Sequence, residues 1–216
     1  MKAIIFDLDG TLLNTIDDIA DSMNDVLGRH GLPPYPVEAY KLMVGDGAAI
    51  LVLRATEGTE TAGHLLRQME EEFVAEYARR QADKTAPYPG IPELLEGLAA
   101  RRVKMAVYSN KPHASAIGVV SQYFPGIKFD AVIGQRPGYP VKPDPGGALE
   151  ILEIMSLPRE EVLYIGDTAT DMRTAAAAGL QAIGALWGFR GKAELEESGA
   201  TLFAQEPADV LAYFVE

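Results

Sequence analysis

The stretch that decides the fold is AIIFDLDGT, residues 3–11 of a chain of 216 residues. An apolar run opens it, and Asp7 and Asp9 follow at once, together with Gly10 and Thr11. A continuous apolar run of this length is typical of a β-strand that is covered on both faces. Polar groups directly after such a strand lie at the edge of the sheet where ligands bind. The stretch therefore predicts a buried strand that leads into a functional site.

Apolar runs of strand length recur later in the chain and alternate with helical patterns. We expect further strands at 103–108, 129–133, 162–165, 182–186 and, as a weaker pattern, 201–203. We expect helices at 92–100, 113–124, 146–155, 169–178 and 207–214. Strands that alternate with helices predict a parallel, doubly wound sheet with right-handed crossovers. The predicted fold class is therefore α/β, with a Rossmann-like core.

One stretch interrupts this alternation, because residues 15–83 show helical patterns and no convincing strand. Apolar residues from Ile16 to Leu27 share one helical face, and Thr15 with Asp18 resembles a capping signal at its start. A long helix is expected at 61–81, after two shorter ones. The pattern predicts an α-helical cap domain at 15–83, inserted into a core domain made of residues 1–14 and 84–216.

The composition excludes several classes of protein. Lys and Arg number 19 against 31 Asp and Glu, a formal net charge of −12, which argues against nucleic acid or an anionic membrane surface as a partner. Cysteine is absent, so disulfides, zinc–thiolate sites and cysteine nucleophiles are excluded. The sequence shows neither a membrane-spanning run nor a signal peptide, and we expect a cytoplasmic protein. It also lacks the glycine-rich motifs of nucleotide-loop enzymes.

The residues that follow the expected strands carry the candidate chemistry. Ser109 and Asn110 follow the second strand, and Lys142 lies in the loop beyond the third. Asp167 and Asp171 follow the fourth strand. Because the carboxyl ends of parallel strands meet at one edge of a sheet, we expect these side chains to converge with the aspartates of the first strand.

Clustered aspartates repel one another unless a cation lies among them. Asp7, Asp9 and Asp167 offer oxygen ligands without histidine or cysteine, and such a set favours Mg²⁺. With that ion, Lys142 and the donors of Ser109 and Asn110, the cluster can hold a phosphate. One carboxylate can then attack phosphorus, while a second protonates the leaving alcohol and later activates water.

The spacing of the first two aspartates sets a condition on this chemistry. Alternate residues of a regular strand face opposite ways, so Asp7 and Asp9 converge only if the strand ends between them. Gly10 makes such a turn cheap. An Asp-x-Asp-Gly sequence alone is often an ordinary turn, and only its combination with the later strand ends favours a catalytic site.

The motifs, taken in order, resemble those of the haloacid dehalogenase superfamily phosphatases. Asp7-Leu8-Asp9-Gly10-Thr11 resembles the first motif, and Ser109 resembles the second. Lys142-Pro143 resembles the third motif, and GDTATD at 166–171 resembles the fourth. The helical insert is similar to the cap of the branch that includes phosphoglycolate phosphatase and β-phosphoglucomutase. The resemblance covers essentially the whole chain.

The resemblance implies which carboxylates hold the metal and which react. Asp7 would be the nucleophile and a ligand of Mg²⁺. Asp9 would be the general acid and base, and would give its backbone carbonyl to the metal. Asp167 would be the remaining metal carboxylate, with Asp171 as a supporting or water-mediated partner.

The resemblance also implies which residues bind the phosphate. Ser109 and Asn110 would bind the transferring phosphoryl group, and Lys142 would steady both that group and the nucleophile. Gly10 and Thr11 would shape the phosphate loop.

In the cap, Val44-Gly45-Asp46-Gly47-Ala48 is similar to the loop that helps phosphoglycolate phosphatases choose their substrate. Asp46 stands where asparagine is usual. Its charge would disfavour a substrate with a carboxylate unless Arg54, Lys41 or the metal offsets it. Arg54 is the candidate substrate clamp of the cap.

The function implied is a Mg²⁺-dependent phosphatase for a small phosphorylated metabolite, most similar to a phosphoglycolate phosphatase and working as a monomer or homodimer. Alternatives within the superfamily are a phosphosugar mutase, a pyrophosphatase or another phosphatase. An alternative of a different class is a non-catalytic phospho-acceptor or regulatory module. Such modules also use aspartate, lysine and a hydroxyl with Mg²⁺, but an intact Asp9 favours turnover.

Overall fold

The computed structural model describes residues 1–59 and 61–214, and the chain divides into two compact units. Residues 1–14 and 87–214 belong to the core unit, and Thr15–Ala86 forms the helical unit. The helical unit therefore extends beyond residue 83, where the sequence placed its end. The unit extends this far because the backbone N–H groups of Lys84 and Thr85 donate to the carboxylate of Asp18 in α1 (Ile16–Arg29).

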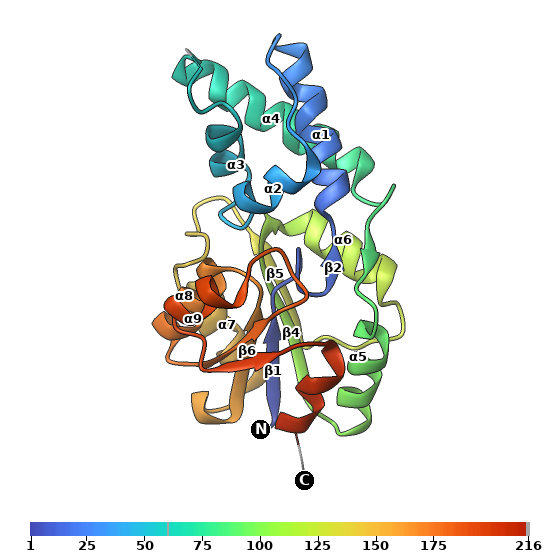
Figure 1. Ribbon diagram of the computed structural model, residues 1–216. Coiled ribbons are helices and arrows are strands. Elements are labelled where there is room, and N and C mark those ends of the chain that lie inside the picture. Colours follow the sequence, from blue (N-terminus) through green and yellow to red (C-terminus); the bar gives the residue numbers. More distant parts are fainter. Residues whose placement is uncertain (60, 215–216) are drawn as a thin grey trace. The chain divides into compact units, whose positions relative to one another are not determined.

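Six strands of the described chain form one parallel sheet in the core unit, in the order β5-β4-β1-β6-β7-β8 (Figure 1). The strands are β1 (Ala3–Phe6), β4 (Lys104–Pro112), β5 (Ala131–Gln135), β6 (Val162–Gly166), β7 (Gln181–Ala185) and β8 (Leu202–Ala204). The chain builds outward from β1 through β4 to β5 and then returns to β6 on the other side of β1. The topological switch therefore lies at β1, which is where a doubly wound sheet binds its ligand.

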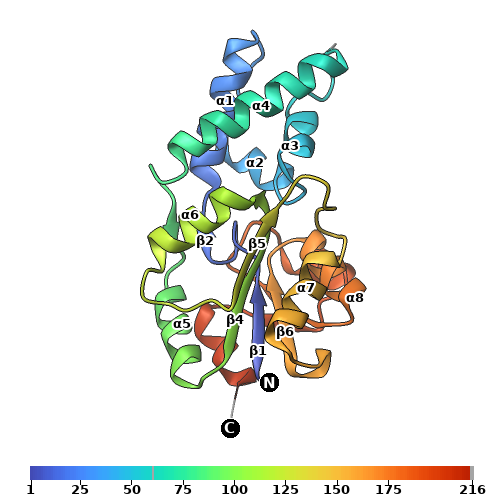
Figure 2. The ribbon, with the colours of Figure 1, turned by 180° about the vertical axis from the view of Figure 1, so that it is seen from behind.

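Helices cover both faces of this sheet (Figure 2). One face packs against α5 (Ile91–Ala100), α6 (His113–Tyr123) and the 3-10 helix η2 (Pro207–Tyr213). The other face packs against α7 (Gly146–Met155), α8 (Ala169–Ala178) and α9 (Lys192–Glu197). In β1, Ile4 and Phe6 enter the first layer, whereas Ala3 and Ile5 enter the second. The doubly wound α/β class predicted from the sequence is confirmed.

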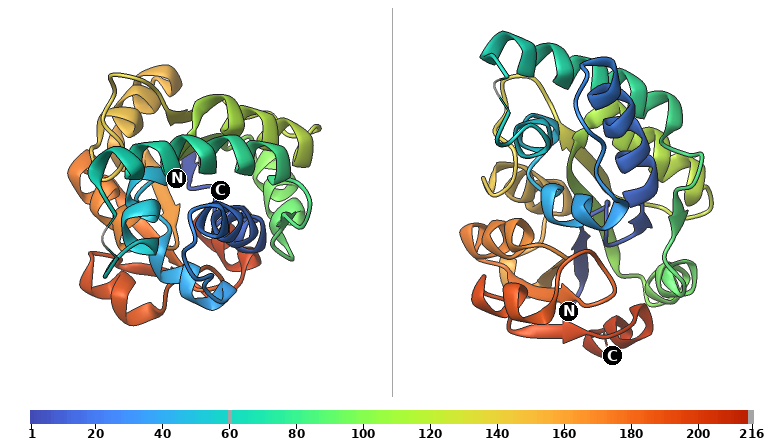
Figure 3. Two further views of the ribbon diagram at one scale, coloured as in Figure 1. Left: turned by 90° about the horizontal axis from the view of Figure 1, so that it is seen from above. Right: turned by 45° about the horizontal axis from the view of Figure 1, so that its top comes forward.

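The helical unit contains α1 (Ile16–Arg29), α2 (Val37–Met43), α3 (Ala48–Ala55) and α4 (Gly63–Arg80). Helix α1 packs against α4 (Figure 3), and the buried side chains include Met23, Tyr40, Met69 and Phe73. The predicted start of α1 is confirmed, since Thr15 is its N-cap residue, but the side chain of Thr15 makes no capping hydrogen bond.

Some short elements escaped the sequence patterns. Strands β2 (Leu13–Asn14) and β3 (Ala86–Pro87) pair with each other where the chain leaves and re-enters the core unit. Each is too short for a hydrophobic period, and α9, a helix of six residues, is too short for one as well. In the described part of the chain, no helix combines the length and the apolar character that crossing a membrane requires.

Candidate active site

The first site residue stands where β1 ends. Asp7 follows Phe6 directly, and the chain then turns so tightly that the carbonyl of Leu8 accepts hydrogen bonds from several of the next N–H groups. Gly10 has a φ of +93°, in the region that favours glycine. A Cβ at Gly10 would also collide with the carboxylate of Asp167. The glycine therefore serves both the turn and the close approach of a second aspartate.

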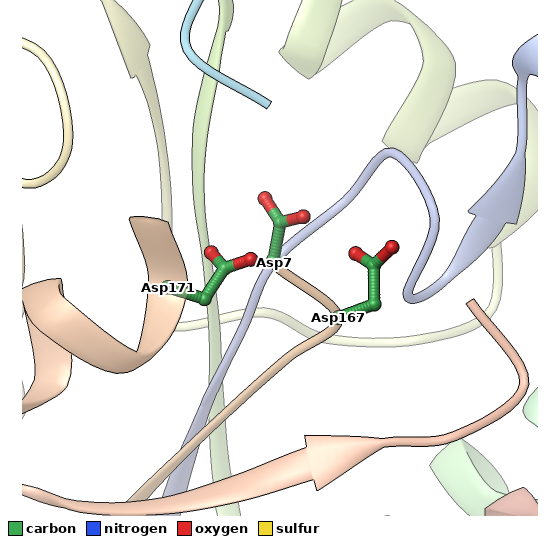
Figure 4. Close-up of side chains that lie close together, drawn as sticks. All are labelled: Asp7, Asp167 and Asp171. Atoms are coloured by element: carbon green, nitrogen blue, oxygen red, sulfur yellow. The ribbon is translucent and has the colours of Figure 1, made fainter. Parts of the chain in front are cut away.

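Three buried carboxylates meet at the carboxyl end of the sheet (Figure 4). Asp7, Asp167 and Asp171 each offer an oxygen atom within 4.8 Å of the others. Lys142, itself buried, lies against two of them: its Nζ donates to Oδ1 of Asp7 at 2.6 Å and to Oδ1 of Asp171 at 2.7 Å. The structure thus brings together four side chains that the sequence places beyond three different strands.

The charges of this cluster are not balanced by Lys142 alone. Burial, followed by the charge of Asp171, raises the pKa of Asp7 well above its usual value, and Lys142 opposes this only in part. Burial and then Asp171 likewise raise the pKa of Asp167 to about 7. Burial by itself lowers the pKa of Lys142, but Asp171 and Asp7 outweigh it and the net shift is upward. The carboxylates therefore gain from a further cation, and an all-oxygen donor set fits Mg²⁺.

Asp171 is held from several directions. Its Oδ2 accepts from the backbone N–H and the hydroxyl of Thr168, which caps α8. Its Oδ1 accepts from Lys142 and, at 3.3 Å, from the hydroxyl of Tyr164. This carboxylate is anchored by the protein and orients Lys142. Its predicted place beside the metal stays a prediction.

Asp167 is fixed by two loops of the core unit. Its Oδ1 accepts from the hydroxyl of Thr11 at 3.1 Å, and its Oδ2 accepts from the backbone N–H of Phe189 at 2.7 Å. The indole of Trp187 donates to the carbonyl of Thr11 at 2.9 Å, and Gly188 passes so close to Asp167 that a Cβ would overlap with it. Trp187 also packs against the hydrophobic core of this unit. The sequence signal that could have placed Trp187 and Gly188 at the site was their position just after β7 (Gln181–Ala185).

The end of β4 carries Ser109 and Asn110. The register of β4 against β5 shifts between Tyr108 and Pro112, so the strand bulges where it reaches the site. Gly134 on β5 makes room for the bulge, because a Cβ there would meet the backbone of Lys111. Ser109 and Asn110 are both buried at this edge, in the place the sequence predicted for them.

Lys111 is a site residue that sequence reasoning missed. Its Nζ donates to Oδ1 of Asp9 at 2.8 Å, and its side chain is only 2% exposed. Asp9 keeps 21% of its side chain exposed. The available signal was the position of Lys111 directly after Ser109-Asn110 at a strand end. A lysine there is read as a solvated surface charge, because lysine is seldom buried.

Arg54 lies on α3 in the helical unit. Its guanidinium donates to the carboxylate of Asp46 at 2.6 Å and to the carbonyl of Met43 at 2.8 Å. The ion pair with Arg54 therefore offsets the negative charge of Asp46. A direct contact of Arg54 with substrate stays a prediction.

Known proteins match this chain over most of its length. The model of the haloacid dehalogenase-like hydrolase family matches residues 4–185. "Phosphoglycolate phosphatase 1" of Pseudomonas aeruginosa is 29% identical over 213 residues, which is 97% of this chain and 78% of that protein. The phosphoglycolate phosphatase of Rhodospirillum rubrum is 33% identical over 199 residues, 87% of this chain and 80% of that protein.

Solved structures share the fold of this chain over nearly its whole length. A candidate phosphoglycolate phosphatase from Lactobacillus delbrueckii has a TM-score of 0.92 and 31% identity, covering 99% of this chain and 98% of that one. A predicted phosphoglycolate phosphatase from Haemophilus somnus has a TM-score of 0.90 and 26% identity, covering 100% and 98%.

A parallel sheet with aspartates at its carboxyl edge, and a helical insert after its first strand, defines a class of hydrolases. The chain belongs to the haloacid dehalogenase-like hydrolases. The relatives named above are phosphoglycolate phosphatases, and they support an enzyme that hydrolyses phosphoric monoesters.

Proposed function

We propose that this hydrolase is a Mg²⁺-dependent phosphatase that acts on phosphoglycolate or a closely similar small phosphomonoester. The observation that carries the proposal is the buried cluster of Asp7, Asp167 and Asp171 around the ammonium of Lys142. Its excess of carboxylates fits a divalent cation, and its position at the switch point of the sheet fits substrate binding. The proposed enzyme is a cytoplasmic monomer or homodimer that binds neither nucleic acid nor membrane.

Asp7 and Asp167 would hold the metal, together with the backbone carbonyl of Asp9. When bound, Mg²⁺ would neutralise the oxygens of the phosphoryl group and leave phosphorus open to attack. The hydroxyl of Ser109 and the backbone beside it would contribute donors to the same oxygens. Lys142 would add a fixed positive charge, since both of its carboxylate partners hold its ammonium in place.

The covalent steps fall to Asp7 and Asp9. A carboxylate oxygen of Asp7 attacks phosphorus, and the bond between phosphorus and the ester oxygen breaks while Asp9 gives its proton to that oxygen. The free alcohol leaves, and an aspartyl-phosphate remains. Asp9, now ionised, takes a proton from a water molecule, which attacks phosphorus and releases inorganic phosphate. Asp7 is thereby restored as a carboxylate, and the cycle needs no other reactant.

The substrate assignment rests on the phosphoglycolate phosphatases among the relatives. The main objection from the sequence was the charge of Asp46 in the cap loop. Its ion pair with Arg54 answers that objection, because a paired carboxylate repels a substrate carboxylate less strongly.

The test is a phosphate-release screen with purified protein and Mg²⁺ over phosphoglycolate, sugar phosphates, nucleoside monophosphates and pyrophosphate. We expect phosphoglycolate to be preferred, and activity to be lost in EDTA and in Asp7→Asn. Interconversion of phosphosugars without net phosphate release would instead identify a mutase. A single stoichiometric phosphorylation without turnover would identify a phospho-acceptor, and a preference for pyrophosphate would reject the monoester substrate.

A further inference from the structure

We infer that Lys111 is a positioning residue that holds the carboxylate of Asp9 where it exchanges protons with substrate and water. The inference rests on the proposed function, which makes Asp9 the general acid and base. Lys111 would not touch the reacting atoms itself. It would act through the hydrogen bond from its Nζ to Oδ1 of Asp9.

The energetic argument starts from the burial of Lys111. A lysine side chain that is only 2% exposed is costly unless its ammonium has a hydrogen-bond acceptor, and Oδ1 of Asp9 supplies one at 2.8 Å. Oδ1 can accept this bond both when Asp9 is ionised and when the proton that Asp9 gives to the leaving oxygen is on Oδ2. The two residues are 102 positions apart in sequence, so the contact ties the turn after β1 to the end of β4. Because Asp9 itself is partly exposed, its side chain depends on this contact for a fixed position.

The backbone of Lys111 is anchored in turn. Its N–H donates to the hydroxyl oxygen of Ser109 at 3.1 Å, and its carbonyl lies against Gly134 of β5. The same bulge therefore places Ser109, which is proposed to bind the phosphoryl group, and Lys111, which holds Asp9. This arrangement fixes the position of the proton donor, Asp9, relative to the bound phosphate. General acid catalysis requires that the donor lie within hydrogen-bond reach of the atom it protonates. A misplacement of about 1 Å can cost about 100-fold in rate.

The experiment uses esters that differ in their need for a proton. Ethyl phosphate and phosphoglycolate release poor leaving groups, whereas p-nitrophenyl phosphate releases a phenolate that needs no protonation. The measured quantity is kcat/KM, because it reports the steps up to formation of the phospho-enzyme and is independent of its hydrolysis. We expect Lys111→Met to lower kcat/KM for both alkyl esters by about 10- to 100-fold more than for the aryl ester. Lys111→Arg should recover part of that loss.

A double variant separates positioning from other roles. In an Asp9→Asn background, Lys111→Met should cause no further loss that is selective for the alkyl esters, because the group it positions has gone. Equal losses on all three esters would overturn the inference and make Lys111 merely structural. A loss confined to phosphoglycolate would overturn it too, because Lys111 would then contact the substrate carboxylate.

The proposed function can fail separately. If Asp9→Asn itself shows no selectivity between alkyl and aryl esters, the acid role of Asp9 is wrong and the inference falls with it. If Asp9→Asn is selective and Lys111→Met is not, only the positioning role is wrong. Lys2→Met is the matched control, since Lys2 pairs with Glu161 on the surface at the other end of β1 and should change none of the three rates. Thermal unfolding of Lys111→Met and Lys111→Arg checks that both variants fold.

Discussion

The side-chain amide of Asn110 makes two hydrogen bonds to the backbone of Lys142, one as donor and one as acceptor. Nδ2 of Asn110 donates to the carbonyl of Lys142 at 3.1 Å, and Oδ1 of Asn110 accepts from the N–H of Lys142 at 2.8 Å. The sequence predicted that Asn110 binds the phosphoryl group. Its side chain holds the loop that carries Lys142, and a contact of Asn110 with the phosphoryl group stays a prediction.

This pair of hydrogen bonds predicts that Asn110→Ala weakens catalysis through Lys142. The change leaves a buried N–H and carbonyl without their partner, which costs roughly 1–3 kcal/mol of unfolding free energy. We expect kcat on phosphoglycolate to fall by about 10-fold or more, because the ammonium of Lys142 is no longer fixed beside Asp7. Urea denaturation and steady-state kinetics measure the two effects.

The chain offers a matched control for Asn110. Asn24 in the helical unit makes the same pair of hydrogen bonds with the backbone of Tyr35, at 2.9 Å in each direction. Because Asn24 also accepts from the hydroxyl of Tyr40 at 2.7 Å, Asn24→Ala should cost at least as much stability, with a much smaller loss of kcat. If both variants lose kcat equally, the effect of Asn110 reflects stability and not the position of Lys142.

A second prediction concerns the loop that holds Asp167. A Cβ at Gly188 would overlap with Asp167 and with the carbonyl of Gly10, so Gly188→Ala must push the loop away. Asp167 then loses the hydrogen bond from Phe189, and we expect Mg²⁺-dependent activity to fall by at least about 10-fold. Gly191→Ala is the control, because nothing lies within 4 Å of its Cβ position and its φ of −81° suits any residue. Equal activities of the two variants would contradict the role of this loop.

Much of the core was predictable because its signals are local. Ala3–Phe6 reads as a buried strand from hydrophobicity alone, and the residues after each strand converge because parallel strands share one edge. Thr15 marks the start of α1 as its spacing with Asp18 predicts, but the spacing does not show which groups the two side chains bond. The carboxylate of Asp18 instead bonds Thr85 and Lys84, 66 or more positions away.

Contacts between loops that are far apart in the sequence could not be predicted, because they leave no local sequence pattern. Nothing local shows that Lys111 is buried against Asp9, that Trp187 reaches the carbonyl of Thr11, or that Gly188 makes room for Asp167. Each depends on which loops the finished sheet brings side by side. Such positioning residues are therefore found in the structure, whereas the reacting residues are found in the motifs.

A third prediction separates metal binding from stability at Asp167. Burial and the charge of Asp171 disfavour the ionised carboxylate, which is why its pKa is raised to about 7. Without metal, a neutral amide in its place relieves this repulsion, so we expect Asp167→Asn to raise the unfolding temperature above pH 7. The wild-type protein should gain about 2.7 kcal/mol of stability from Mg²⁺ at 100 times its dissociation constant. Asp167→Asn should gain little.

Thermal unfolding with and without Mg²⁺ measures both parts of this prediction. Asp209→Asn is a suitable control, because Asp209 accepts backbone hydrogen bonds near the surface of the same unit. That variant should keep the full response to Mg²⁺. An unchanged response in Asp167→Asn would remove Asp167 from the set of metal ligands.

The last prediction concerns how the stability of the helical unit depends on pH through the carboxylate of Glu76. Glu76 of α4 forms ion pairs with Arg29 of α1 at 2.8 Å and with Arg80 at 2.6 Å, and it also pairs with Arg79. Hydrogen bonding from Arg29, supported by Arg80 and Arg79, lowers the pKa of Glu76 from 4.5 to about 2. A lowered pKa in the folded state means that the carboxylate stabilises the fold above pH 4.5 and that this contribution disappears as pH falls toward 2. Glu76→Gln should therefore cost roughly 1–3 kcal/mol of unfolding free energy at pH 7, and its difference from the wild type should shrink between pH 4.5 and 3.

Urea denaturation across that pH range measures the difference in unfolding free energy, with Glu71→Gln at an exposed position of the same helix as the control. A difference that stays constant down to pH 3 would show that Glu76 acts through its shape and not its charge.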